Sequence, residues 1–133
     1  MTRVAVLLGL GLLLVVSTFA QQPADDLRFT GKTTVMEGKD LTVARRHFEP
    51  GARSAWHSHG KGQLLMVEEG RMRTQKRGQA VKELGVGESD YTAPDLAHWH
   101  GAASGQALVQ INVGFGGETK WMEKVTDAEY NRK

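Results

Sequence analysis

Short runs of alternating or apolar residues, each ended by a glycine or a proline, follow one another along most of this chain. Runs of this length are typical of strands, and turn residues at this spacing favour a sandwich or barrel of antiparallel strands over alternating strands and helices. The expected strands are Thr33–Met36, Leu41–Phe48, Ser54–His59, Gln63–Glu69, Arg71–Lys76, Val81–Leu84, Asp90–Ala93, His98–Gly101 and Ala107–Val113. The predicted fold class is therefore all-β.

The C-terminal end of the chain carries a helix signal. Thr126 is followed three residues later by Glu129. This is the spacing of a capping box, in which Thr126 caps the helix N-terminus and the Glu129 side chain reaches back to the Thr126 backbone. A short C-terminal helix is therefore expected after the last strand.

The first twenty residues have the pattern of a secretory signal peptide. Arg3 supplies a positive charge, Val4–Val16 is an unbroken run of apolar residues and glycine, and Ala20 provides a small residue at the cleavage position. A membrane anchor is the alternative, although a spanning helix needs roughly 20 apolar residues. Cleavage near Ala20 would give a secreted or periplasmic protein with no stable membrane anchor. In that protein, residues 21–26 are expected to form a flexible lead-in and residues 27–131 a single domain.

The charge balance gives no reason to expect a nucleic-acid or membrane partner. The chain has 17 lysines and arginines against 15 aspartates and glutamates, and it has no cysteine. Its basic cluster between Arg71 and Arg77 has no interleaved aromatic residues and is interpreted as a solvated strand and turn. The expected partner is a small molecule.

Four of the five histidines fall in two His-x-His pairs, His57 with His59 and His98 with His100. Alternate residues of a strand point to the same face, about 6.6 Å apart along the strand, so each pair could turn two imidazoles toward one metal ion. Gln63 follows the turn after His59, and its side-chain oxygen could reach the same point. The alternative is that these histidines are surface or core residues bonded to their neighbours.

The residues around these histidines resemble the two cupin motifs. Gly51-x5-His57-x-His59-x3-Gln63-x6-Gly70 is similar to the first motif, with glutamine where many cupins have glutamate. Gly87 through Pro94-x3-His98 is similar to the second motif, with Leu96 where a glycine is frequent. Three segments are also similar to the small bacterial cupins that include manganese-dependent hydroxynitrile lyases: Gly51-Ala-Arg-Ser-Ala-Trp-His57, His98-Trp-His-Gly-Ala102 and Trp121-Met-Glu-Lys-Val-Thr-Asp127.

This resemblance implies a cupin β-barrel, also called a double-stranded β-helix or jelly roll, in a family whose members are commonly homo-oligomers. It implies a metal ion held by His57, His59, Gln63 and His98, with His100 as a pocket histidine that is not a ligand. Manganese is the metal of that group, and imidazole and amide ligands also suit iron, cobalt or zinc. Four neutral ligands would leave the charge of the ion uncompensated, which favours an anionic substrate.

Three pocket positions depart from those lyases. Gln110 and Asn112 stand where the lyases have a histidine and a small residue, and Arg46 stands at a position that is apolar in them. Within Ala107–Val113, the even-numbered residues are expected to face the pocket and the apolar odd-numbered ones a packed core. Alternation places Arg46 and its neighbour Arg45 on opposite faces of their strand but does not say which of them faces inward.

The residues next to the predicted ligands are expected to point away from the site. Trp56 and Trp99 each stand one position from a predicted ligand, and are interpreted as packing residues rather than substrate platforms. Simple alternation also places Ser54 opposite His57, although it matches a threonine near the site of the lyases.

Three functions are compatible with this pattern. A metal-dependent lyase would activate a small hydroxy or carbonyl compound, with His100 moving a proton and Gln110 and Arg46 completing the catalytic pocket. Gln110 has no titratable group near neutral pH and cannot be a general base, which counts against a strict hydroxynitrile lyase. The alternatives are an oxygenase that uses the same ion with dioxygen, and a non-catalytic periplasmic binder of a small anion. The lyase is the preferred hypothesis.

Overall fold

The computed structural model describes residue 30 and residues 33–132 of the 133-residue chain. By its contacts the chain divides after Met36, and the compact unit Glu37–Lys133 contains the strands and the helix of the described residues. The predicted signal peptide and lead-in lie outside the described residues. In the described part of the chain, no helix is long and apolar enough to cross a membrane.

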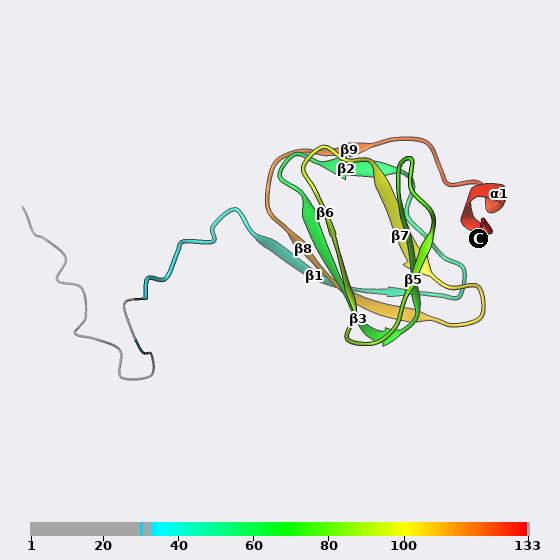
Figure 1. The fold of residues 1–133 in the computed structure, drawn as a ribbon, viewed down its shortest axis with the longest axis horizontal. Coiled ribbons are helices and arrows are strands. Elements are labelled where there is room, and N and C mark those ends of the chain that lie inside the picture. The colour runs from blue at the N-terminus through cyan, green and yellow to red at the C-terminus, as the bar shows by residue number, and fades with distance from the viewer. Residues whose placement is uncertain (1–29, 31–32, 133) are drawn as a thin grey trace, which may run out of the picture. The chain divides into compact units, whose positions relative to one another are not determined.

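The strands form two antiparallel sheets that enclose a barrel interior (Figure 1). Sheet A contains, in spatial order, β1 (Thr42–Phe48), β8 (Leu108–Gly114), β3 (Gln63–Gly70) and β6 (Ser89–Thr92). Sheet B contains, in spatial order, β5 (Lys82–Leu84), β4 (Met72–Lys76), β7 (His98–Ala102), β2 (His57–His59) and β9 (Thr119–Trp121). Strands from the two ends of the chain lie next to each other in each sheet. The expected all-β barrel is confirmed.

The strands differ from the expected ones by more than one residue in three places. Thr33–Met36 has no regular structure, because β-forming residues need a partner strand and none pairs with this segment within the described residues. Ser54–Trp56 is an irregular segment before β2. Strand β9 was not expected, because its three residues show no alternation and its ladder depends on pairing with β2.

The space between the sheets is apolar at one end and polar at the other. Its apolar end is a cluster of buried side chains from both sheets: Leu65, Val67, Met72, Ala102 and Leu108. Two positions away along the same inner faces, buried polar side chains replace them: Gln63 on β3, His100 on β7 and Gln110 on β8. Burial of each leucine, valine or methionine side chain of this cluster stabilises the fold by about 1.5–3 kcal/mol. The apolar end of the barrel therefore stabilises the fold, and the polar end carries the side chains suited to binding.

The outer face of sheet A carries a partly buried apolar surface beside the charged pair Arg45–Glu68. This apolar surface is made by Val43, Leu64, Met66, Tyr91, Val109, Ile111 and Val113, which the strand register aligns in adjacent rows. Val43 is 70% exposed and Tyr91 51% exposed, and the β8 residues are half-buried. The expectation that the odd-numbered residues of Ala107–Val113 face a packed core is therefore wrong within one chain. They lie on the outer face because the even-numbered residues point into the barrel.

The outer face of sheet B is covered by the C-terminal segment. Trp56 and Trp99 form a buried cluster there with Val125 and Tyr130. The Trp99 indole donates a hydrogen bond to Gln75 Oε1 at 3.0 Å. Both tryptophans therefore pack away from the barrel interior, as expected from their positions next to the histidines.

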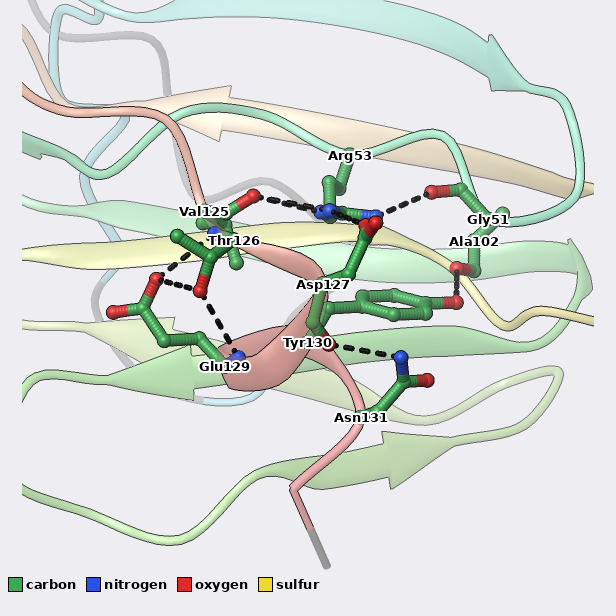
Figure 2. Close-up of polar contacts among 9 residues, drawn as sticks. All are labelled: Gly51, Arg53, Ala102, Val125, Thr126, Asp127, Glu129, Tyr130 and Asn131. Atoms are coloured by element: carbon green, nitrogen blue, oxygen red, sulfur yellow. Dashed lines mark hydrogen bonds and ion pairs between the residues drawn. The ribbon is translucent and has the colours of Figure 1, made fainter.

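Helix α1 (Asp127–Tyr130) begins with the predicted capping box, which is confirmed (Figure 2). The Thr126 hydroxyl accepts a hydrogen bond from the Glu129 backbone N–H at 3.2 Å, and the Glu129 carboxylate accepts one from the Thr126 backbone N–H at 2.9 Å. A cap of this kind contributes about 1 kcal/mol to helix stability, which matters in a helix of four residues.

Two side chains fasten this helix to the barrel (Figure 2). The Tyr130 hydroxyl donates to the backbone oxygen of Ala102 on β7 at 2.7 Å. Arg53 donates to the backbone oxygen of Val125 at 3.0 Å and pairs with Asp127 at 2.6 Å. The chain before β2 is thereby held against the C-terminal segment, close to the polar end of the barrel.

Candidate metal centre and small-molecule cavity

A cavity of about 410 Å³ lies at the polar end of the barrel. Its walls come from β1, β2, β3, β7, β8 and β9 and from the segment before β2: Arg46, Phe48, Arg53, Ser54, His57, His59, Gln63, His100, Asn112, Thr119 and Trp121. This volume is in the lower part of the range for small-molecule sites. Among the described residues, the lining includes two arginines and no carboxylate.

Strands β2 and β7 bring the histidines of both His-x-His pairs together. His57 pairs with His98 across the two strands, and alternation turns His59 and His100 to the same side. The ring centroid of His57 lies 4.3 Å from that of His98, 5.0 Å from that of His59 and 5.3 Å from that of His100. One ring nitrogen in each of His57, His98 and His100 lies within 4.8 Å of the other two.

Three of these rings are oriented by a hydrogen bond at Nδ1. His57 Nδ1 contacts the backbone oxygen of Ala55 at 3.0 Å, and His98 Nδ1 contacts that of Leu96 at 3.3 Å. His59 Nδ1 contacts the Thr119 hydroxyl at 3.0 Å, and its buried Nε2 has no partner within the described residues. A histidine that holds a metal through Nε2 is commonly fixed in this way, with its other nitrogen donating to an oxygen.

His98 faces two oxygen acceptors with only one proton. Its Nδ1 faces the Leu96 carbonyl oxygen, and its Nε2 faces the amide oxygen of Gln63 at 3.0 Å. A neutral imidazole has one N–H and one lone pair, so one of these contacts lacks a hydrogen. A cation between Nε2 and Gln63 Oε1 would satisfy both atoms.

Burial keeps these histidines neutral. Loss of hydration lowers the pKa of His57 and His59, and it holds the pKa of His100 well below its usual value. Burial, helped by repulsion from a charged His57, lowers the pKa of His98 to about 3. Each ring therefore keeps a lone pair at neutral pH, which is the form that binds a metal ion. The lowered pKa of His98 also means that the ring does not carry protons on both nitrogens at neutral pH.

His100 has a different hydrogen-bond partner from the other three. The Gln110 amide nitrogen lies 3.1 Å from His100 Nδ1 and donates to Asn112 Oδ1 at 2.5 Å. An amide N–H at Nδ1 leaves the His100 proton on Nε2. The Gln110 oxygen is buried without a partner within the described residues. The structure thus places Gln110 in contact with His100, and not at the cavity wall.

Arg46 lies on the inner face of β1. It pairs across the strands with Gln110 and lines the cavity beside Phe48 and Asn112. Its neighbour Arg45 lies on the opposite face, where it binds Glu68 through Nε at 2.5 Å and through a terminal nitrogen at 2.8 Å. Alternation alone could not say whether Arg45 or Arg46 faces the barrel interior. The register of β1 with β8 shows that Arg46 does.

Comparison with known proteins identifies the family. The family profile described as a cupin domain matches residues 44–114, more than half of the chain. The chain belongs to the cupin family. The matched segment runs from β1 to β8 and contains both histidine pairs, Gln63 and Gln110.

Relatives of this cupin include one of named activity. A protein of Granulicella tundricola named (R)-mandelonitrile lyase is 43% identical over 88 residues, which cover 64% of this chain and 67% of the relative. A solved cupin-like protein from Thermotoga maritima is 39% identical, with a TM-score of 0.66, over 68% of this chain and 71% of that chain. A DMSP lyase from Ruegeria pomeroyi has the same fold at 12% identity and a TM-score of 0.58, over 66% of this chain and 46% of that chain.

The cupin site contains residues that the sequence pattern did not assign. Thr119 orients His59 from β9, and Trp121 places its ring 4.7 Å from that of His57. Ser54 lines the cavity, and its hydroxyl accepts the His100 backbone N–H at 3.1 Å. The alternation argument was wrong for Ser54, because residues 54–56 do not form a strand. Gly101, directly after His100, is the sequence feature that could have indicated this position of Ser54.

That glycine allows the chain before β2 to lie against β7. A Cβ atom on Gly101 would lie 2.3 Å from the backbone oxygen of Ala52 and 2.5 Å from the Arg53 Cα. Only glycine permits this approach, which forms an isolated bridge between Arg53 and Gly101. The approach brings Ser54 to the His100 backbone.

Proposed function

We propose that this cupin is a metal-dependent lyase that acts on small hydroxy or carbonyl compounds, with manganese as its metal. The observation that carries the proposal is His98, a buried neutral ring facing two oxygen acceptors. Three buried histidines that could bind a metal stand beside a cavity of small-molecule size.

The proposed ligands are His57, His59 and His98 through Nε2, and Gln63 through its amide oxygen. His59 is preferred to His100 because its Nε2 is buried without a partner among the described residues and its Nδ1 is already bonded. When bound, a divalent ion with four neutral ligands supplies Lewis acidity that stabilises negative charge on a substrate oxygen.

His100 is the proposed hydrogen-bond donor to the substrate. The Gln110 amide at Nδ1 leaves the proton of His100 on Nε2, and the ring lines the cavity. A neutral ring with its proton on Nε2 can donate a hydrogen bond to a substrate oxygen and so stabilise negative charge that develops there. Gln110 then acts as a positioning residue that selects the tautomer of His100.

The lyase is preferred to the alternatives because of the relative that is 43% identical and named (R)-mandelonitrile lyase. The polar residues Arg46 and Asn112 of the cavity wall favour a substrate other than an aromatic cyanohydrin. We propose that the substrate is small and carries a negative charge.

The test is metal analysis of the protein purified from its own compartment, followed by a substrate screen with the metal found. We expect about one manganese ion per chain and turnover of hydroxy or carbonyl compounds, with mandelonitrile as the first compound tested. Turnover that consumes dioxygen would instead indicate an oxygenase. Tight binding of small anions without turnover of any compound would indicate a periplasmic binder.

We also propose that the chain is exported and cleaved after Ala20. The support is the pattern of the first twenty residues, a basic residue followed by an apolar run. N-terminal sequencing of the exported protein should begin at Gln21. A full-length chain retained in the membrane fraction would contradict this proposal.

The last proposal on function concerns assembly: the chain forms a homo-oligomer through the outer face of sheet A. An apolar patch that is continuous across four strands can pack on the same patch of a second copy, because such a contact is self-complementary. The resemblance to cupins that are commonly homo-oligomers supports a second copy as the occupant.

A further inference from the structure

The two neighbouring arginines of β1 have different surroundings. Arg45 points outward and is matched by Glu68 through two contacts. Arg46 lies on the inner face of β1 and lines the cavity, where it is exposed to solvent, and it has no ion pair within the described residues. Arg45 therefore forms an ion pair on the outer surface, whereas the charge of Arg46 faces the cavity.

The other arginine of the cavity is already neutralised. Arg53 pairs with Asp127 at 2.6 Å and donates to the Val125 backbone oxygen at 3.0 Å. Its side chain is only 19% exposed. Because no carboxylate of the described residues lines the cavity, the charge of Arg46 is not balanced by any lining group. An anionic ligand would balance it.

The wall next to Arg46 offers hydrogen-bond donors. Asn112 uses its side-chain oxygen to accept a hydrogen bond from the Gln110 amide, so its own amide N–H groups remain for the cavity. His100 accepts at Nδ1 from the same amide, so its Nε2 is also a donor. Three groups on this wall therefore donate: the Arg46 guanidinium, the Asn112 amide and the His100 ring.

We propose that the cavity binds a small carboxylate that also carries a hydroxyl or carbonyl oxygen. The carboxylate lies on Arg46 and Asn112, since a guanidinium binds a carboxylate through two parallel hydrogen bonds. The second oxygen lies toward His100 and the other histidines. The place of this second oxygen rests on the proposed lyase function, whereas the carboxylate site rests on Arg46 and Asn112 alone.

Matched acids and amides test this inference by calorimetric titration of the manganese-loaded protein. We expect lactate to bind more tightly than lactamide, and mandelate more tightly than mandelamide. Arg46→Ala should weaken lactate binding about 10- to 150-fold, the range for loss of a charge-assisted hydrogen bond, and should leave lactamide binding nearly unchanged. Asn112→Asp should weaken lactate binding as well, because it places a negative charge beside the carboxylate.

The matched control is Arg45→Ala, which removes the same side chain from the next position of the same strand. It should keep the preference for lactate over lactamide. Equal binding of lactate and lactamide by the unmodified protein, or equal losses in Arg45→Ala and Arg46→Ala, would overturn the inference. Turnover of mandelonitrile in the same preparations separates this inference from the proposed lyase function. Turnover without a preference for carboxylates would overturn the carboxylate site alone. A preference for carboxylates without turnover of any compound would overturn the lyase function alone.

Discussion

At the scale of single residues, the different partners of His98 and His100 predict different effects of substitution on metal binding. Its ring is fully buried and neutral, and its Nε2 faces the Gln63 oxygen at 3.0 Å. His100 stands two residues along the same strand, and its Nδ1 contacts the Gln110 amide. Two histidines of one His-x-His pair therefore face different chemical partners, and their roles should separate in experiment.

Metal content should distinguish these two histidines. His98→Ala removes a proposed ligand and should lose most of the bound divalent ion, because the remaining three ligands are left incomplete. His100→Ala should keep about one ion per chain and lose turnover. Elemental analysis after dialysis, with His57→Ala and His59→Ala alongside, measures both effects. Equal loss of metal in all four variants would show that His100 is a ligand.

The sequence could place the histidines but not the arginines. A His-x-His pair in a strand must turn both rings to one face, and the two pairs meet because β2 and β7 are neighbours. Arg45 and Arg46 lie on an edge strand that is exposed along most of its length, so no apolar pattern marks its inner face. The decisive fact, the register of Arg46 with Gln110, joins residues far apart in the sequence.

At the scale of elements, the turn after β3 depends on the backbone of one glycine. Gly70 has a φ of 79°, and a Cβ atom there would lie 1.8 Å from the Ala107 backbone oxygen. The register of β3 against β8 shifts just before it, between Val67 and Glu69. The glycine expected from the motif is thus required by the close approach of the two strands.

Gly70→Ala should therefore lower the free energy of unfolding by at least about 2 kcal/mol, from left-handed strain together with the steric clash. Gly78→Ala is the matched control, because Gly78 has a φ of 80° and a Cβ atom added to it would meet no neighbouring group within 4 Å. It should cost only the strain, about 1–2 kcal/mol. Urea unfolding of both variants measures the difference. Equal costs would show that the turn relaxes without loss.

The sequence indicated the longer strands but not β9. Strands such as β3 and β8 alternate between the core and the outside, so their pattern is visible. Strand β9 is three residues long and is exposed except at Thr119. It exists because β2 offers it an edge, and that edge cannot be read from residues 119–121. The ligand orientation that Thr119 provides was missed for the same reason.

At the scale of the whole molecule, the two sheets differ in how their outer faces are treated. Sheet B is covered by the C-terminal segment, which buries Trp56 and Trp99. Sheet A presents branched apolar residues on its outer face, with Val43 and Tyr91 exposed. A continuous row of exposed apolar residues on a sheet is a candidate contact surface. The odd-numbered residues of β8, expected to be packed, are half-buried in the described chain, and a second copy would cover them in the proposed assembly.

Ile111→Lys tests this assembly at the centre of the outer face of sheet A. Ile111 lies between Arg45 and Met66 in the sheet register, so a lysine there would place a charge in the middle of the proposed contact, where desolvation is costly. We expect the unmodified protein to run as an oligomer in light scattering coupled to size exclusion, and Ile111→Lys to run as a folded monomer. Val86→Lys is the control, since Val86 is 67% exposed in the turn between β5 and β6 and should leave the oligomer intact. A monomeric unmodified protein, or an oligomer that survives Ile111→Lys, would show that this face is not the contact between copies.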